Sequence, residues 1–221
     1  MRIRRKPWAK PELAQCAFFV SNPNELVGKW SNKFDKKQPI HLELGCGKGS
    51  FIARIAFENE DINYIATDVK SEMLACTRRN IVNIFQNKSI DNVLLTACDI
   101  QRIDSIFCKE DIIERIYINF CNPWHKRKHK KRRLTYPLQL NKYKVFLKDK
   151  GKIFFKTDDD ELFEESKNYF IQCGFDIVYN TYDLHKENLS FNIETEHEKM
   201  FITEGCKIKF LIAQNNLFIK G

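Results

Sequence analysis

The stretch Ile40-His41-Leu42-Glu43-Leu44-Gly45-Cys46-Gly47-Lys48-Gly49-Ser50-Phe51 decides the fold of this chain. Its first five residues are typical of a strand, its three alternate glycines form a tight turn, and the apolar residues 51–57 are typical of a buried helix face. Glycine is required in this turn because the backbone must reach positive φ, and because a Cβ would keep a bulky cofactor away. Strand, turn and helix therefore predict the binding site of a nucleotide or nucleoside cofactor.

The spacing of the glycines and a nearby acid distinguish between cofactors. A dinucleotide-binding turn has the pattern G-x-G-x-x-G and a helix N-terminus that faces a pyrophosphate, whereas Gly45, Gly47 and Gly49 form G-x-G-x-G. Glu43 comes two residues before the first glycine, where its carboxylate would repel a pyrophosphate and hold a cationic ligand. S-adenosylmethionine carries an ammonium group and a sulfonium centre but no phosphate, so this pattern predicts S-adenosylmethionine.

Acidic residues also end the next two predicted strands. Asp68 follows residues 64–67 and is placed to accept hydrogen bonds from the two ribose hydroxyls of the donor. Asp68 alone would fit NAD equally well, so Glu43 and the glycine spacing decide between the two cofactors. An isolated turn of this kind is more often a plain turn in another α/β protein. Asp99 follows residues 93–98 and is expected beside the adenine of the donor, a role that is compatible with capping the next helix.

Basic residues are concentrated in two stretches. The chain has 221 residues, a net charge of +8 and a pI near 9.0. Residues 1–10 hold five Lys or Arg and residues 126–133 hold seven, with no acid in either stretch. Without these twelve the chain has 25 basic and 29 acidic residues, a net charge of −4. Such a distribution is typical of a protein that binds a polyanion.

The length of the chain predicts one domain with one core. We expect a basic N-terminal arm and lead-in over residues 1–38 and a single domain over residues 39–221. No apolar stretch is long enough to cross a bilayer and residues 1–8 have no signal-peptide pattern, so a cytoplasmic protein is expected. The eight cysteines are scattered without metal-ligand spacing, which predicts reduced thiols and no metal site. A monomer and a homodimer both remain open.

Strand and helix patterns alternate from residue 40 onward, which is typical of a parallel sheet covered on both faces. The predicted fold class is therefore α/β, with a mostly parallel seven-stranded sheet. Together with the turn that predicts S-adenosylmethionine, this indicates a single Rossmann-like class I methyltransferase domain. Prolines exclude a regular helix from the arm, and residues 12–20 form a short helix or an extended lead-in. The expected strands are 40–44, 64–68, 93–98, 116–120, 151–156, 175–183 and 208–214, and the expected helices are 50–57, 71–85 with Ser71 as N-cap, 136–147 and 161–173.

The fourth predicted strand leads into Cys121-Asn122-Pro123-Trp124 and then into a strongly basic run. Ligands of open α/β sheets bind at the carboxyl ends of the strands, so Asn122 is expected to face the reactive end of the donor. Residues 126–133, which we call the basic segment, follow at the mouth of this predicted site. A run of charges is usually a solvated surface or a localisation signal, but this position favours contact with RNA.

Two further polar stretches follow predicted strands. Thr157-Asp158-Asp159-Asp160 is favoured as a helix cap over a metal site, because three consecutive carboxylates rarely converge on one ion. Asp158 is nevertheless expected on the same rim of strand ends as Glu43 and Asn122. The long loop 184–206 includes Thr195-Glu196-His197-Glu198 and is expected to contact the substrate.

These motifs resemble the bacterial tRNA (guanine-N7-)-methyltransferases, the TrmB family, over nearly the whole chain. The matching motifs are R-I-R-R-K-P-W-A, H-L-E-L-G-C-G-K-G-S-F, N-F-C-N-P-W-H-K-R-K-H-K-K-R-R-L-T-Y, F-K-T-D and T-E-H-E. The proline-tryptophan-basic run is the specific element, because the glycine turn alone indicates only a methyltransferase. The resemblance implies an enzyme that transfers a methyl group from S-adenosylmethionine to N7 of a guanosine in the variable loop of tRNA.

The resemblance also implies the roles of individual residues. Asn122 and Asp158 would be catalytic, although the family commonly has an acid where this chain has Asn122 and an aromatic residue where it has His197. An amide cannot offset a developing positive charge, so binding should survive this change better than chemistry. The donor site would comprise Glu43, Gly45, Gly47, Gly49, Asp68, Asp99 and Asn122; the guanosine site Lys126, Asp158, Thr195, Glu196, His197 and Glu198; and the tRNA contacts Lys128, His129, Lys130, Lys131, Arg132 and Arg133.

Methylation at guanine N7 sets modest chemical demands. N7 is unprotonated at neutral pH and already nucleophilic, so the enzyme needs no general base but must align the reacting atoms and stabilise a cationic purine. A carboxylate, Asp158 or Glu198, is expected to accept hydrogen bonds from the guanine, which must first be pulled out of folded tRNA.

Other function classes remain open from the sequence. A methyltransferase of the same fold that acts on a protein or a small molecule has no use for twelve basic residues in two stretches. A non-catalytic RNA-binding protein with a degenerate donor pocket is suggested by Asn122. The turn spacing disfavours a nicotinamide enzyme.

Overall fold

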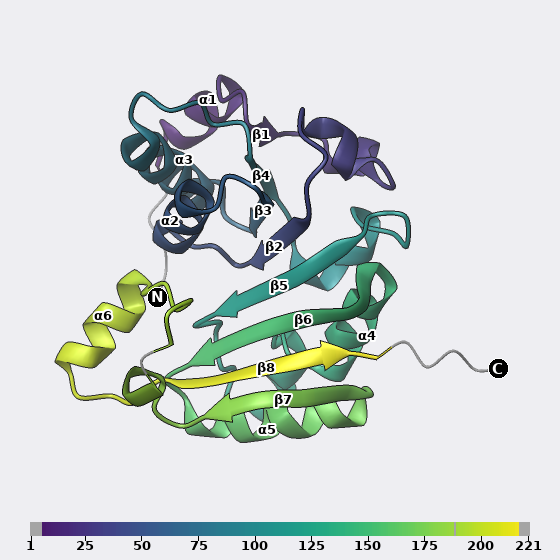
Figure 1. Cartoon of the computed structure of the whole chain (residues 1–221), viewed down its shortest axis with the longest axis vertical. Coiled ribbons are helices and arrows are strands. Elements are labelled where there is room, and N and C mark those ends of the chain that lie inside the picture. Colours follow the sequence, from purple (N-terminus) through teal and green to yellow (C-terminus); the bar gives the residue numbers. More distant parts are fainter. Residues whose placement is uncertain (1–5, 188, 217–221) are drawn as a thin grey trace. The chain divides into compact units, whose positions relative to one another are not determined.

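The computed structural model of the protein describes residues 6–187 and 189–216 (Figure 1). Arg2, Arg4 and Arg5 of the predicted arm lie outside the described residues. The chain divides into two units, Met1–Asp111 and Ile112–Gly221, which we call unit 1 and unit 2 and describe in turn.

Unit 1 contains a parallel sheet with the strand order β1-β4-β3-β2. The glycine turn joins β2 to α2 as predicted, and the register from Ile40–Asn63 to Leu44–Thr67 brings the carboxyl ends of β2 and β3 to one edge. All five residues of β2 are buried, as is typical of a strand in a parallel sheet. The strands are β1 (Phe19–Val20), β2 (Ile40–Leu44), β3 (Asn63–Asp68) and β4 (Val93–Ala97).

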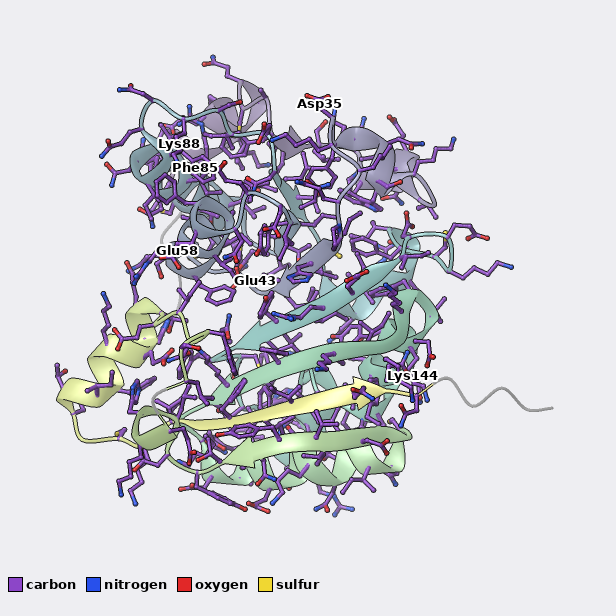
Figure 2. All side chains as sticks on the ribbon, viewed as in Figure 1. Asp35, Glu43, Glu58, Phe85, Lys88 and Lys144 are labelled. Atoms are coloured by element: carbon purple, nitrogen blue, oxygen red, sulfur yellow. The ribbon has the colours of Figure 1, made fainter. Side chains whose placement is uncertain are left out.

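The helices of unit 1 largely follow the apolar pattern of the sequence. α3 begins and ends at the predicted residues, and its Phe85, labelled with Lys88 in Figure 2, packs edge-on against Phe57 of α2 at 5.6 Å between ring centroids. The α-helices are α1 (Ala9–Ala14), α2 (Ser50–Glu58) and α3 (Ser71–Phe85), and the 3-10 helices are η1 (Pro23–Leu26), η2 (Trp30–Lys33) and η3 (Ile100–Ser105).

Three predictions for unit 1 are wrong. The last residues of the arm are helical, because Pro11 lies in the first turn of α1, where its missing N–H has no acceptor to lose. Ser71 does not cap α3, since Lys70 occupies the N-cap position and no side chain caps the helix there. The predicted number of strands is too low, because the lead-in forms the short strand β1, which pairs with β4.

Unit 2 contains a mixed sheet with the strand order β5-β6-β8-β7. β5 and β6 are parallel, whereas β8 is antiparallel to both of its neighbours. Figure 1 shows α4 and α5 behind this sheet and α6 at the end of it where β5 and β6 point. The strands are β5 (Ile113–Asn119), β6 (Leu147–Thr157), β7 (Phe175–Thr181) and β8 (Lys209–Asn215), and the helices are η4 (Arg127–Arg132), α4 (Pro137–Phe146), α5 (Asp160–Gln172), η5 (Leu184–Glu187) and α6 (Glu196–Thr203).

The described residues therefore form eight strands where seven are predicted, and the additional strand is β1. The prediction of a loop over residues 184–206 is wrong in part, because this segment contains the helices η5 and α6. No described helix has the length and the apolar character that are needed to cross a membrane. All eight cysteines are free thiols, as predicted, and four of them are buried: Cys16, Cys46, Cys98 and Cys173.

Candidate functional site

The glycine turn of unit 1 needs glycine for different reasons at different positions. Gly45, Gly47 and Gly49 have φ values of 76°, 56° and 79°, in the left-handed region that side chains avoid. A Cβ at Gly49 would lie 2.2 Å from Cγ2 of Thr77, whereas a Cβ at Gly47 would have no atom within 4 Å. The turn is thus closed against α3 at Gly49 and open at Gly47, as the predicted cofactor site requires.

Side chains from α3 and β3 fix the polar groups of the turn. Thr77 Oγ1 donates to the Gly47 carbonyl at 2.9 Å, and Asn80 Nδ2 donates to the Lys48 carbonyl at 2.9 Å. The Asp68 carboxylate accepts from Gly47 N at 3.1 Å and from Lys70 N at 2.8 Å. The Gly47 N–H, which would face the pyrophosphate in a dinucleotide fold, is therefore bonded to a carboxylate.

The surroundings of the turn are anionic. Glu43 lies on β2 (Figure 2) with 2% of its surface exposed, and Asp68 is half-buried. Burial raises the pKa of Asp68, although its hydrogen bonds from backbone N–H groups oppose this shift. Burial also raises the pKa of Cys46 well above its usual value, and the nearby charges of Glu43 and Asp68 add to this. Such an environment favours a cation over a phosphate.

Asp99 lies at the end of β4 beside a cavity. Its carboxylate accepts from Gln101 N at 3.0 Å, which confirms the predicted helix cap, and the rest of the side chain is exposed. The cavity has a volume of about 230 Å³ and is also lined by Pro23, Cys98 and Arg102. Glu43, Asp68 and the three glycines do not line it.

The loop after β5 in unit 2 has an unusual backbone. Phe120 and Trp124 have φ values of 51° and 46°, in the left-handed region that bulky residues rarely adopt. Between them, the exposed Asn122 accepts a hydrogen bond from Trp124 N through Oδ1 at 3.0 Å. Strained backbone of this kind clusters at functional loops. The geometry therefore supports the prediction that the loop with Asn122 is functional.

The structure brings this loop together with the T-E-H-E stretch. The ring of His197 is nearly parallel to that of Phe120, at 5.9 Å between centroids and an angle of 20°, and Phe201 packs against both rings. His197 is exposed and lies in the first turn of α6. Two stretches that are far apart in the sequence therefore meet within unit 2.

Thr195 and Glu198 form a capping box that starts α6. Thr195 Oγ1 accepts from Glu198 N at 3.0 Å, and the Glu198 carboxylate accepts from Thr195 N at 3.3 Å. Glu198 is fully buried, pairs with Lys156 Nζ of β6 at 3.0 Å and accepts from Asn192 Nδ2 at 2.8 Å. Its carboxylate is thus occupied by the protein itself.

Asp158 and its neighbour Asp159 have separate surroundings. Asp159 caps α5 by accepting from Leu162 N at 2.7 Å, which confirms the cap that the sequence predicts. Asp158 is partly exposed, and within residues 6–187 and 189–216 no donor bonds to its carboxylate. Among the same residues no three His, Cys, Asp or Glu side chains are grouped as metal ligands would be.

The basic segment is divided between buried and exposed cations. Arg133 is fully buried, and its guanidinium bonds to Glu165 of α5 and to the Pro123 carbonyl. Because it presents no surface to a partner, we remove Arg133 from the expected tRNA contacts. Lys130 is also paired, with Glu161 and Glu165. The exposed members of the segment are Lys126, Arg127, Lys128, Lys131 and Arg132.

Several residues that shape these sites are not among those predicted from the sequence. Thr77, Asn80 and Lys156 act across 30 or more residues of chain, and no local pattern marks such contacts. The helix α6 does have a signal, because T-x-x-E is the signature of a capping box.

Comparison with known proteins identifies the family of the chain. The model of a family described as "Putative methyltransferase" matches residues 37–211. A protein of Clostridium beijerinckii named "tRNA (guanine-N(7)-)-methyltransferase" is 58% identical, covering 98% of this chain and all of the relative. A protein of Acetivibrio thermocellus with the same name is 53% identical over 97% of this chain and 99% of its own.

Solved structures support the fold. The 16S rRNA methyltransferase KamB is similar with a TM-score of 0.60 at 10% identity, covering 85% of this chain and 93% of its own. An antibiotic-related methyltransferase is similar with a TM-score of 0.56 at 19% identity, over 87% and 92% of the two chains. These likenesses confirm the predicted α/β, Rossmann-like methyltransferase fold. With relatives this similar over nearly its whole length, the chain belongs to the family of the tRNA (guanine-N(7)-)-methyltransferases.

Proposed function

We propose that the protein transfers a methyl group from S-adenosylmethionine to N7 of a guanosine in the variable loop of tRNA. The observation that carries the proposal is the hydrogen bond from Gly47 N–H to the Asp68 carboxylate, which supports a cationic nucleoside rather than a pyrophosphate at the turn. The names of the relatives supply the RNA and the atom that is methylated. We place the activity in the cytoplasm and in the domain over residues 39–221.

The residues of unit 1 fit the methyl donor. Gly47 leaves space over the turn, and Asp68 keeps acceptor capacity beyond its two backbone bonds. We assign Asp68 to the ribose hydroxyls, Glu43 to the positive end of the donor and Asp99 to its adenine. When bound, S-adenosylmethionine supplies a sulfonium-activated methyl group. The turn, fixed by Thr77 and Asn80, keeps this site in one conformation.

The residues of unit 2 would hold the guanosine. We assign the contact with the guanine N1–H and amino group to Asp158, because its carboxylate is not occupied by another described residue, whereas that of Glu198 is. Lys126 would contact the nucleotide, and the exposed ring of His197 would lie against the base. A fixed carboxylate also stabilises the positive charge that develops on the purine. Asn122 would position the reactants without supplying charge.

The exposed cations of the basic segment would bind the phosphates of tRNA. Such contacts release counterions, so affinity falls steeply with salt concentration. They would also offset the few kcal/mol that extraction of the guanosine from its tertiary pairing costs. We propose Lys128, Lys131 and Arg132 for this role. His129 would contact the RNA without supplying charge, because burial and the neighbouring cations lower its pKa.

The proposal is tested by incubating an unmodified tRNA transcript with protein and S-adenosylmethionine and identifying the nucleosides by mass spectrometry. We expect 7-methylguanosine, and none from a transcript whose variable-loop guanosine is replaced by adenosine. Labelled methyl groups in protein or in rRNA instead would favour a different substrate class. Absence of heat in a titration with S-adenosylmethionine would favour a non-catalytic RNA-binding protein. A mass measurement in solution would distinguish a monomer from a homodimer.

A further inference from the structure

Acidic residues at the start of α5 hold part of the basic segment in place. Lys130 Nζ lies 2.7 Å from Glu161 Oε1 and is also bonded to Glu165. Arg133 bonds to Glu165 through Nη1 and lies 3.4 Å from Glu161 through Nη2. Just before the segment, His125 lies 3.3 Å from Glu161. Glu161 therefore contacts residues before and after the start of the turn η4, and Glu165 contacts residues at its C-terminal end.

These contacts are set in a partly buried environment. Arg133 has no exposed side-chain surface, and Lys130 is 24% exposed. Hydrogen bonds from Lys130 and His125 lower the pKa of Glu161 to about 2. Burial would raise the pKa of Glu165, but hydrogen bonds from Lys130 and Tyr169 and the charge of Arg133 outweigh it, so the pKa is lowered. Both carboxylates are thus ionised at neutral pH, as a stable attachment requires.

The ion pairs with Glu161 and Glu165 determine which cations of the basic segment remain available to bind RNA. Lys130 and Arg133 are paired with α5, whereas Lys128, Lys131 and Arg132 are exposed on the same turn. Arg132 also lies over the Trp124 ring, at 5.3 Å from its centroid. A turn that is fixed before a partner arrives avoids the entropy cost of ordering its long side chains and backbone during binding.

We propose that Glu161 and Glu165 are positioning residues for tRNA binding, which hold Lys130 and Arg133 so that the turn η4 presents its exposed cations to the phosphates. This inference rests on the proposed function, because it assumes that the basic segment contacts tRNA. Neither glutamate is expected to touch the RNA. Two negative charges beside a polyanion site are therefore expected to strengthen binding.

The sign of this effect makes the inference testable. By simple electrostatics, removing a negative charge next to an RNA surface tightens RNA binding. By the positioning role, the same change weakens RNA binding, because the turn loses its attachment. Glu164 offers a matched control one residue away on α5, where it contacts Lys167 and Tyr182 instead of the basic segment.

The experiment measures tRNA binding by filter retention across a salt series for Glu165→Gln, Glu161→Gln and Glu164→Gln. Loss of one phosphate contact lowers the slope of log affinity against log salt by about 0.9, which is about fivefold in affinity near 0.15 M salt. We expect Glu165→Gln to weaken binding by at least this factor and Glu164→Gln to leave it unchanged or slightly tighter. KM for tRNA should rise with kcat at saturating tRNA unchanged.

A fourth variant separates this inference from the proposed function. Replacing Lys128, Lys131 and Arg132 by Ala removes the exposed cations directly. If this triple variant binds tRNA normally, the assignment of the basic segment as a tRNA-binding surface is wrong. If it binds weakly while Glu165→Gln and Glu161→Gln bind as tightly as Glu164→Gln, the positioning role alone is refuted. Thermal unfolding of each variant checks the fold, and Glu161, whose side chain is 44% exposed, keeps the test valid if Glu165→Gln is unstable.

Discussion

Replacement of Glu198 by alanine separates a structural role of this carboxylate from a direct role in guanine binding. Glu198 and Lys156 form an ion pair at 3.0 Å with 0% and 7% of their side chains exposed. The same carboxylate accepts from Asn192 and from Thr195 N at the start of α6. Glu198→Ala therefore removes the charged partner of a buried lysine, which keeps its hydrogen bonds to Asn192 and to the Ile193 carbonyl, and it removes the carboxylate half of the capping box.

The expected loss of stability is large. Breaking a buried ion pair by removing one partner costs about 3–5 kcal/mol. In a protein of about this size, 1 kcal/mol shifts the melting temperature by about 2–4 °C, so Glu198→Ala should lower it by about 6–20 °C. Asp158→Ala removes a partly exposed carboxylate and should shift it by no more than about 2 °C.

Thermal and urea unfolding, measured beside methyl transfer to tRNA, provide the assay. We expect Glu198→Ala to lose stability and activity together, and Asp158→Ala to lose activity alone. The double variant Lys156→Met with Glu198→Leu should recover most of the stability, because no buried charge is left unpaired. A Glu198→Ala protein of normal melting temperature without activity would refute the reasoning and identify Glu198 as a group that contacts the base.

Three further changes have defined outcomes. In urea unfolding, Gly49→Ala should destabilise the protein by more than about 2 kcal/mol, because positive φ costs roughly 1–2 kcal/mol and the new Cβ would lie 2.2 Å from Cγ2 of Thr77. Gly47→Ala should show only the backbone cost, because its Cβ would meet no atom within 4 Å. The carboxyl of Glu161 should titrate near pH 2 by NMR, and its contribution to stability, present in full above pH 4.5, should be lost as the pH falls toward 2; a midpoint near 4.5 would contradict the attachment. Asp68→Asn should weaken S-adenosylmethionine binding at least about tenfold by calorimetry, which is the 1.4 kcal/mol of one charge-assisted hydrogen bond, and unchanged affinity would exclude it from the donor site.

Local sequence patterns predict the elements of this fold well. The glycine turn and the strands around it follow from period-two apolar residues and from the conformations that only glycine adopts readily. The bounds of α3 match because its apolar face is regular over fifteen residues. β1 is missed because a two-residue strand has no period of its own and exists through its pairing with β4.

Side-chain roles are harder to predict because they depend on distant partners. Arg133 is indistinguishable in the sequence from the other cations of the basic segment, yet Glu165, 32 residues later, accounts for its burial. In the sequence nothing indicates that the carboxylate of Glu198 is buried and paired, because its partner Lys156 lies 42 residues earlier. The helix α6 could have been predicted from its capping box, but few apolar residues follow Thr195 to suggest a helix.

The strand order of unit 2 has a consequence for biosynthesis. β8 follows β7 in the sequence and lies between β6 and β7. Among the described strands β7 pairs with β8 alone, so it gains this neighbour only when residues 209–215 have left the ribosome. Unit 1 has no such dependence, because all four of its strands come from the first 97 residues. A nascent chain can therefore assemble its first sheet while the second awaits residues 209–215, with the edges of β6 and β7 exposed to chaperones in the interval.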